Sequence, residues 1–133
     1  MHKESTRIYV NNDLDIILAR MQTRTMAKAM GFNTADQARI SLAASELAKV
    51  VSWTRHERTE MIISNASRNG HQGLQVVCLV QQKHIVQEEG DQNDNDEQLA
   101  RRSFLGACRL VDESCIEPEN DQQARVTLIK WLR

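Results

Sequence analysis

Apolar and polar residues alternate with two different periods along the first thirty residues, and these periods predict a strand followed by a helix. In residues 6–10, Ile8 and Val10 fall on one side of an extended segment and Tyr9 on the other. From residue 13 to residue 30, apolar side chains recur every three or four positions, as in an amphipathic helix. The apolar stripe of this helix consists of Leu14, Ile17, Leu18 and Met21.

The ends of this helix and of a second one are marked by residues typical of helix caps. Asp13 is suited to cap the first helix, and Gly31 to end it. Thr34 and Gln37 have the spacing of a capping box, which predicts a second helix running to about Trp53. The residues expected to face inward on the second helix are Ile40, Ala44, Leu47 and Val51.

The second half of the chain is dominated by apolar runs of strand length. Residues 60–64 and 74–80 predict a hairpin of antiparallel strands, because Asn-Gly and Gln-Gly dipeptides lie between them. Residues 98–111 predict a helix, and residues 124–131 a last strand preceded by Pro118 at a sheet edge. The apolar residues of that helix are Leu99, Leu105, Cys108 and Val111. The last strand is expected to place Val126, Leu128 and Lys130 on one face.

This order of elements predicts an α+β two-layer sandwich, in which helices cover one face of a mostly antiparallel, mixed sheet. Residues 1–133 contain no linker or internal repeat, so one domain is expected. Residues 86–97 hold six acidic residues and no basic one, which predicts a mobile acidic loop near 86–100.

Charge and hydropathy narrow the classes of function. The formal net charge is -1, but residues 1–84 carry net +4 and residues 85–133 net -5, so electrostatic recognition is expected to be local. A chain with a net negative charge and five aromatic residues is not typical of nucleic-acid binding. No apolar stretch has the length of a membrane span or a signal peptide, which favours a cytoplasmic protein.

The residues that could bind a metal ion do not have the sequence spacing of known metal sites. The three cysteines, Cys78, Cys108 and Cys115, form no close pair and are expected to be reduced and mostly buried. The four histidines are scattered, so neither they nor the cysteines predict zinc. A calcium loop starting at Asp91 would need glycine where Asp96 stands and glutamate where Arg102 stands. No metal is therefore expected.

Four segments of the chain carry a family resemblance: DIILARMQTRTMAKAMGF, TADQARISLAASELAKVV, GACRLVDE and the terminal TLIKWLR. Together they resemble the bacterial switch kinases and anti-sigma-factor serine kinases of the GHKL (HATPase-like) superfamily, with the stress-signalling switch kinases nearest. The resemblance implies a Bergerat-type ATPase fold that binds ATP and magnesium. It weakens between residues 53 and 104, where this family does its chemistry.

The first nucleotide motif of the family places a glutamate and an asparagine one helical turn apart, as catalytic acid or base and magnesium ligand. Glu46 matches the first position, but Val50 stands at the second and has no oxygen to offer. Glu46 is then a remnant or a structural acid, paired with Lys49 or Arg39, or simply a surface glutamate.

The other two nucleotide motifs are also degenerate. Where the resemblance implies an adenine-binding aspartate and two glycines, the sequence has Val80, Gln82 and His84. Where it implies a glycine-rich phosphate lid, the sequence QLARRSFLG retains Gly106 alone. The hypothesis is a pseudokinase that uses no cofactor. The basic residues Lys83, Arg101 and Arg102 leave open that an anion binds in some other pose.

The resemblance implies partner switching: such a protein binds a STAS-domain antagonist and, when released, a second partner such as a phosphatase regulator or a sigma factor. We expect a non-catalytic regulator of this type, acting as a monomer or a homodimer. The alternative is a divergent, active serine/threonine kinase that binds Mg-ATP. The predicted partner-binding surface is a basic stripe on the first helix, composed of Arg20, Arg24 and Lys28, and a plain solvated face is the other interpretation of this stripe.

Overall fold

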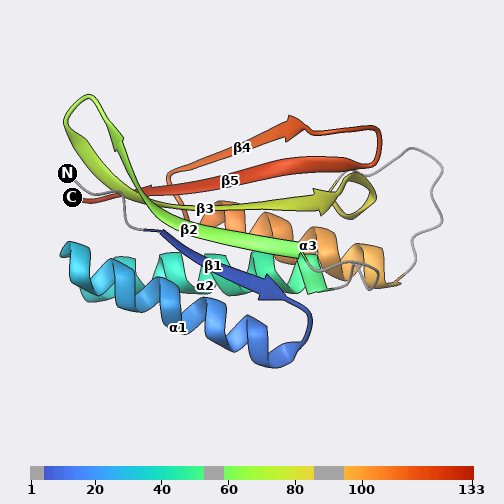
Figure 1. Ribbon diagram of the computed structural model, residues 1–133, viewed down its shortest axis with the longest axis horizontal. Coiled ribbons are helices and arrows are strands. Elements are labelled where there is room, and N and C mark those ends of the chain that lie inside the picture. The colour runs from blue at the N-terminus through green and yellow to red at the C-terminus, as the bar shows by residue number, and fades with distance from the viewer. Residues whose placement is uncertain (1–4, 53–58, 86–94) are drawn as a thin grey trace.

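The computed structural model describes residues 5–52, 59–85 and 95–133 (Figure 1). The helices are α1 (Asp13–Met30), α2 (Thr34–Ser52), the short 3-10 helix η1 (Gln82–His84) and α3 (Asn95–Arg109). The strands are β1 (Ser5–Val10), β2 (Thr59–Arg68), β3 (His71–Gln81), β4 (Glu113–Pro118) and β5 (Gln123–Trp131).

The five strands form one sheet with the order β1-β2-β3-β5-β4, and every neighbouring pair is antiparallel. The helices α1, α2 and α3 all lie on one side of this sheet (Figure 1). The predicted α+β two-layer sandwich is therefore confirmed. The sheet buries one face against the helices and leaves the other uncovered by them, as antiparallel sheets commonly do.

The hairpin between β2 and β3 has a tighter turn than the sequence predicted. Only Asn69 and Gly70 lie outside the strands, and both have positive φ, 52° and 81°. Positive φ at both central residues is the geometry of a two-residue hairpin turn that matches the twist of the strands. The polar residues next to this turn, predicted as loop, instead continue the strands because their backbones pair across the hairpin from Asn65 opposite Leu74 to Arg68 opposite His71.

Strand β4 was not predicted, since the sequence indicated only a connection there. It is an edge strand whose side chains are mostly exposed, including Ile116 at 48%, so it lacks the alternation of a half-buried strand. Cys115 on this strand is exposed, contrary to the expectation of mostly buried thiols. Pro118 ends the strand at the sheet edge, as predicted.

Helix α1 has the predicted span but a different N-cap. Asn12, not Asp13, caps it: the Asn12 Oδ1 accepts from the backbone N–H of Asp15 at 3.1 Å, and the Asp15 carboxylate accepts from the N–H of Asn12 at 3.3 Å. This reciprocal pair is a capping box shifted by one residue from the expected cap. Gly31 ends the helix at φ 96°, as predicted, because this left-handed conformation suits glycine.

Helix α2 likewise begins with a cap one residue before the predicted one. The Oδ1 of Asn33 accepts from the N–H of Asp36 at 2.8 Å, while the Gln37 amide donates to the carbonyl of Phe32 at 2.7 Å. Thr34 is therefore the first helical residue rather than the cap. The four residues predicted to face inward are all buried: Ile40, Ala44, Leu47 and Val51.

Helix α3 begins at Asn95, so residues 95–100 are helical rather than part of the predicted acidic loop near 86–100. Residues 86–94 of that segment, with the calcium loop considered from Asp91, lie outside the described residues. Two of the apolar residues named for this helix, Leu99 and Leu105, are largely exposed. The residues buried instead are Ala100, Phe104 and Ala107.

The buried side of α1 is built mostly from small residues, and α1 packs mainly against α2. Its buried residues are Ala19, Thr23, Met26 and Ala27, of which only Met26 is large. Small side chains let two helix backbones approach closely and favour this side as the contact. The predicted apolar stripe of α1 consequently faces outward, with exposed fractions of 71% at Leu14, 53% at Ile17, 40% at Leu18 and 61% at Met21.

Candidate functional site

The residues predicted for a nucleotide site lie on elements that the fold brings together. Glu46 and Val50 are on α2, Val80 is near the end of β3, and His84 is in η1. Helix α3 packs against both α2 and η1, and α2 also contacts β3. The residues that the sequence predicted for a nucleotide site therefore lie on helices and a strand that are neighbours in the fold.

Glu46 and Val50 lie one helical turn apart but in different environments. The Oε1 of Glu46 is 2.8 Å from the Nζ of Lys49, and its side chain is 20% exposed. This is one of the two pairings that the sequence left open for Glu46. Val50 is fully buried among the core residues. An isopropyl group offers no oxygen for a cation, and its burial removes apolar surface from water.

Val80 and Gln82 are likewise part of the packed structure. Val80 is 1% exposed and lies opposite Ala124 on β5. The backbone N–H of Gln82 donates to the carbonyl of Gln122 at 2.8 Å, and its side-chain amide donates to the carbonyl of Asn120 at 3.0 Å. These bonds hold η1 against the connection between β4 and β5.

His84 is a buried histidine whose Nδ1 has no hydrogen-bond partner in the described part of the chain. Burial lowers its pKa from the ordinary value; the positive charge of Lys83 lowers it further, and the carboxylate of Glu97 opposes the change. The imidazole is therefore neutral near pH 7. Burial favours the neutral form of this side chain more strongly than the Glu97 carboxylate favours the charged form.

The segment that the family resemblance assigns to a phosphate lid is helical. Residues 98–106 all lie within α3, and a Cβ added at Gly106 would meet no atom within 4 Å. Gly106 is thus not required by a turn or a close approach. Of the basic residues considered for anion binding, Lys83 and Arg102 are exposed and Arg101 is half-buried.

The predicted basic stripe is exposed on α1 and adjoins the outward apolar stripe. Arg20, Arg24 and Lys28 all face solvent, and Arg20 also donates to the Ser45 hydroxyl on α2 from its Nε and Nη2, at 3.3 and 3.2 Å. We use the name α1 surface for the group Leu14, Ile17, Leu18, Met21, Arg24 and Lys28. Periodicity alone assigned the apolar part of this surface to the core, so its exposure was not foreseen.

A buried cluster of charges joins α2 to the end of β5. The Nζ of Lys130 lies 3.4 Å from Asp36 Oδ1 and 3.6 Å from Asp112 Oδ1. Asp36 also pairs with Arg39 at 2.8 Å, and Asp112 with Arg133 at 2.6 Å. The only sign of this cluster in the sequence was a lysine on the inward side of the last strand, which indicated burial without naming its partners.

The charges around Asp36 set its protonation. Burial by itself would raise the pKa of Asp36, but the hydrogen bond from Arg39 and the positive charge of Lys130 outweigh it. The pKa therefore lies below its ordinary value of 3.8, and the carboxylate is ionised at neutral pH.

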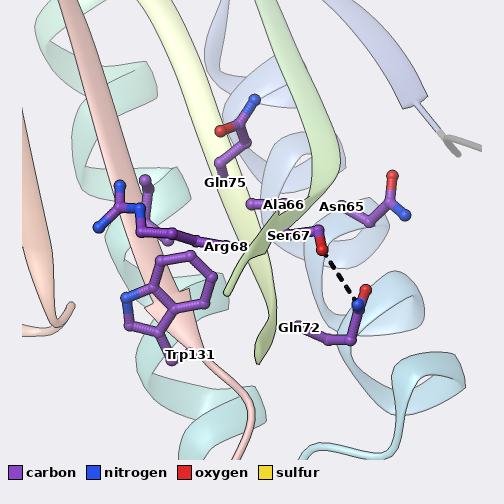
Figure 2. Close-up of a pocket in the computed structure, with 8 residues that line it drawn as sticks. Asn65, Ala66, Ser67, Arg68, Gln72, Gln75 and Trp131 are labelled. Carbon is purple, nitrogen blue, oxygen red and sulfur yellow. Dashed lines mark hydrogen bonds between the residues drawn. The ribbon is translucent and has the colours of Figure 1, made fainter. Parts of the chain in front are cut away.

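A pocket of about 540 Å³ lies at the turn end of the β2–β3 hairpin (Figure 2). The Arg68 guanidinium lies 5.1 Å from the centre of the Trp131 ring and pairs with Glu113 at 2.8 Å. The Trp131 indole N–H also donates to Glu113, and Gln72 donates to Ser67 at 3.2 Å. The charged groups of this pocket are thus bound to one another, which is typical of a structural cluster.

The described ranges contain neither a metal-binding cluster nor a helix that could span a membrane. Within residues 5–52, 59–85 and 95–133, no group of three or more histidine, cysteine, aspartate or glutamate side chains is placed to hold a metal ion. None of the helices described there is both long and apolar enough to cross a membrane.

Comparison with known proteins adds a relative over nearly the full length. No family model matches the chain. The chain is 30% identical over 131 residues to the serine/threonine-protein kinase RsbT of Bacillus subtilis, an alignment that covers 95% of this chain and 96% of RsbT. Because this identity extends over nearly the full length of both chains, the chain belongs to the RsbT switch-kinase family.

Proposed function

We propose that this protein is a partner-switching regulator of bacterial stress or sigma-factor signalling that binds protein partners and has lost ATP-dependent catalysis. Its partners would be a STAS-domain antagonist, and a phosphatase regulator or a sigma factor. Membership of the RsbT family supports the kinase-like ancestry. The observation that carries the loss of catalysis is the complete burial of Val50, one turn after Glu46.

The chemistry at the other candidate positions supports the same proposal. If the GHKL correspondence holds, Val80 replaces the adenine acceptor with an aliphatic side chain, and His84 fills a glycine position with a buried ring. Glu46 is paired with Lys49 rather than left to act on a bound water. These replacements support a site that does not take ATP and magnesium at these positions.

An active, divergent serine/threonine kinase is the alternative, favoured by the retained Glu46 and by 30% identity to a protein kinase. On this alternative, Mg-ATP binds in an altered pose, and Glu46→Ala abolishes that binding. The partner-binding function would then accompany catalysis instead of replacing it, since binding surfaces and active sites are separate features of a fold.

Titration calorimetry with Mg-ATP, together with thermal unfolding, tests the proposal. A ligand present at 100 times its dissociation constant stabilises the folded state by about 2.7 kcal/mol, which a thermal scan detects readily. We expect neither heat nor a shift in midpoint up to millimolar Mg-ATP. Saturable binding that Glu46→Ala removes would establish the alternative, and transfer of the γ-phosphate to a STAS-domain protein would then be measured.

A second variant tests the role of Val50 directly. Val50→Asn restores the residue type that the family resemblance implies at a magnesium ligand, but it places an amide in an apolar core. We expect a loss of about 2 kcal/mol in unfolding free energy and no gain of Mg-ATP binding. Val51→Asn, at a neighbouring buried position of the same helix, is the matched control for the cost of the buried amide.

Binding of a STAS-domain protein from the same genome, measured by interferometry without nucleotide, tests the remaining half of the proposal. Saturable binding in the absence of ATP is expected. Absence of binding to STAS-domain, phosphatase-regulator and sigma-factor candidates alike would contradict a partner-switching role.

A further inference from the structure

The outward side of α1 combines exposed apolar and basic residues in a regular pattern. Leu14, Ile17, Leu18 and Met21 are each at least 40% exposed, although together they are the most apolar part of the helix. Scattered exposed apolar residues are ordinary, but four large ones on one helix face form a contiguous patch of the kind that marks interaction sites.

The spacing of the α1 surface is that of a helix-pairing seam. Residues 14, 17, 21, 24 and 28 follow the alternating three- and four-residue steps of a heptad repeat. In such a seam, each side chain inserts between four residues of a facing helix. The α1 surface is therefore shaped to receive a helix, because its residues lie along one line on a helix that is already anchored by its opposite side.

The seam changes from apolar to basic along its length. Its first two turns carry the apolar residues, whereas Arg24 and Lys28 occupy the seam positions of the last turns. Neither cation forms an ion pair with any carboxylate of the described residues. A facing helix that is apolar at one end and acidic at the other complements this pattern in both hydrophobicity and charge.

We propose that the α1 surface is the docking site for an amphipathic helix of a partner protein, apolar where it meets Leu14 to Met21 and acidic where it meets Arg24 and Lys28. This inference rests on the proposed partner-binding function and names the class of segment that the partner contributes. It assigns the apolar anchors as well as the cations to the interface.

A second copy of α1 fits the surface less well than such a helix. In an antiparallel pair centred on residues 14–21, Arg24 and Lys28 would lie opposite positions before the first helical residue, Asp13. In a parallel pair, the same cations would face their own copies, and like charges placed opposite each other are unfavourable. The basic half of the seam therefore favours a helix of different sequence.

Fluorescence anisotropy with labelled synthetic helices tests the proposal on the full chain. The probe is a helix of about three heptads with leucine at the seam positions of the first two and glutamate at those of the last. The matched peptide carries lysine in place of glutamate. We expect the glutamate peptide to bind at least about tenfold more tightly, and Arg24→Glu with Lys28→Glu to reverse that preference.

The apolar anchors are tested with a matched pair of variants. Ile17 on α1 and Leu105 on α3 are both 53% exposed, so glutamate at either should leave the fold intact. Ile17→Glu should weaken binding of the glutamate peptide roughly 30-fold or more, whereas Leu105→Glu should change it less than about twofold. Circular dichroism and thermal midpoints verify folding of both variants.

Other results would overturn the inference. Equal binding of both peptides by the unaltered protein, which needs no variant to fold, would remove the charge pattern as the basis of recognition. A dimer seen by sedimentation velocity and dissociated by Ile17→Glu would make a second copy the occupant. If a STAS-domain protein binds, Ile17→Glu does not weaken that binding and neither peptide binds, the inference fails while the proposed function stands. If the glutamate peptide binds but no STAS-domain, phosphatase-regulator or sigma-factor protein does, the proposed function fails while α1 remains a helix-binding surface.

Discussion

Replacing Lys130 with methionine removes the central charge of the buried cluster and keeps most of the apolar stem of the side chain. Lys130 is 5% exposed and lies between Asp36 at the start of α2 and Asp112 after α3. Both carboxylates would lose a cation in a position where water does not replace it. The variant therefore measures how strongly this cluster ties α2 to the end of β5.

The size of the loss follows from the partners that remain. Removing one partner of a buried ion pair costs about 3 to 5 kcal/mol, because the other charge is left uncompensated. Here Asp36 keeps Arg39 at 2.8 Å, while Asp112 keeps Arg133 at 2.6 Å and accepts from the backbone N–H of Trp131 at 2.7 Å. We therefore expect the lower end of the range, about 3 kcal/mol, and a fall of roughly 10 °C in the unfolding midpoint.

Chemical denaturation at neutral pH, followed by circular dichroism, measures this loss. Lys49→Met is the matched control, since it breaks an ion pair with Glu46 that is more exposed than the cluster, with 41% and 20% of the two side chains exposed. An ion pair that keeps this much contact with solvent contributes about 0.2 to 1 kcal/mol. A loss for Lys130→Met no larger than that for Lys49→Met would refute the reasoning that burial makes the cluster important.

The same pair of proteins gives a pH dependence with a defined sign. The pKa of Asp36 is lowered in the folded state, so its contribution to stability is present above its unfolded value of about 3.8 and is lost as the pH falls through the folded pKa. The difference between wild type and Lys130→Met should therefore shrink below about pH 3.8. A difference that stays constant down to strongly acidic pH would exclude Asp36 as the partner that matters.

Two further predictions concern glycines and thiols. A Cβ at Gly73 would lie 2.7 Å from Cε3 of Trp131, so Gly73→Ala should lower the unfolding free energy by about 1 to 3 kcal/mol. A Cβ at Gly106 in α3 would meet nothing within 4 Å, so Gly106→Ala should raise the unfolding free energy by about 0.5 to 1 kcal/mol. Equal effects of the two substitutions in denaturant titrations would contradict both expectations. The pKa values of Cys78 and Cys115 are both raised, by burial at Cys78 and by desolvation and the Glu117 carboxylate at Cys115, but only Cys115 is exposed. A thiol reagent at alkaline pH should therefore modify Cys115 in the folded protein and Cys78 only after unfolding, as peptide mass mapping would reveal.

Local sequence signals were sufficient to predict most of the secondary structure. The period of apolar residues predicted β1, α1, α2 and β5, because a regular element places every second or every third to fourth residue on one side. Gly31 marked the end of α1, since few other residues adopt its left-handed conformation without strain. Strand β4 was missed because an edge strand that is exposed on both faces has no such period.

The candidate site was predictable in part. The family resemblance selected Glu46, Val50, Val80 and His84, and the fold places the elements that carry them next to one another. The partners of these side chains were not predictable, because they come from distant parts of the chain, as when the amide of Gln82 donates to Asn120. The absence of Mg-ATP binding at these positions stays a prediction, which titration calorimetry tests.

The sequence by itself determined where most of the helices and strands form, because helix and strand periods are properties of neighbouring residues. Only the tertiary structure decided which side of α1 is covered. Hydrophobicity favoured the larger side chains Leu14, Ile17, Leu18 and Met21, but the side of α1 that is covered carries Ala19, Thr23, Met26 and Ala27 instead. Two helices approach most closely through small side chains, and the fit that results depends on both surfaces at once. That choice leaves the large apolar residues of α1 exposed and available to a partner.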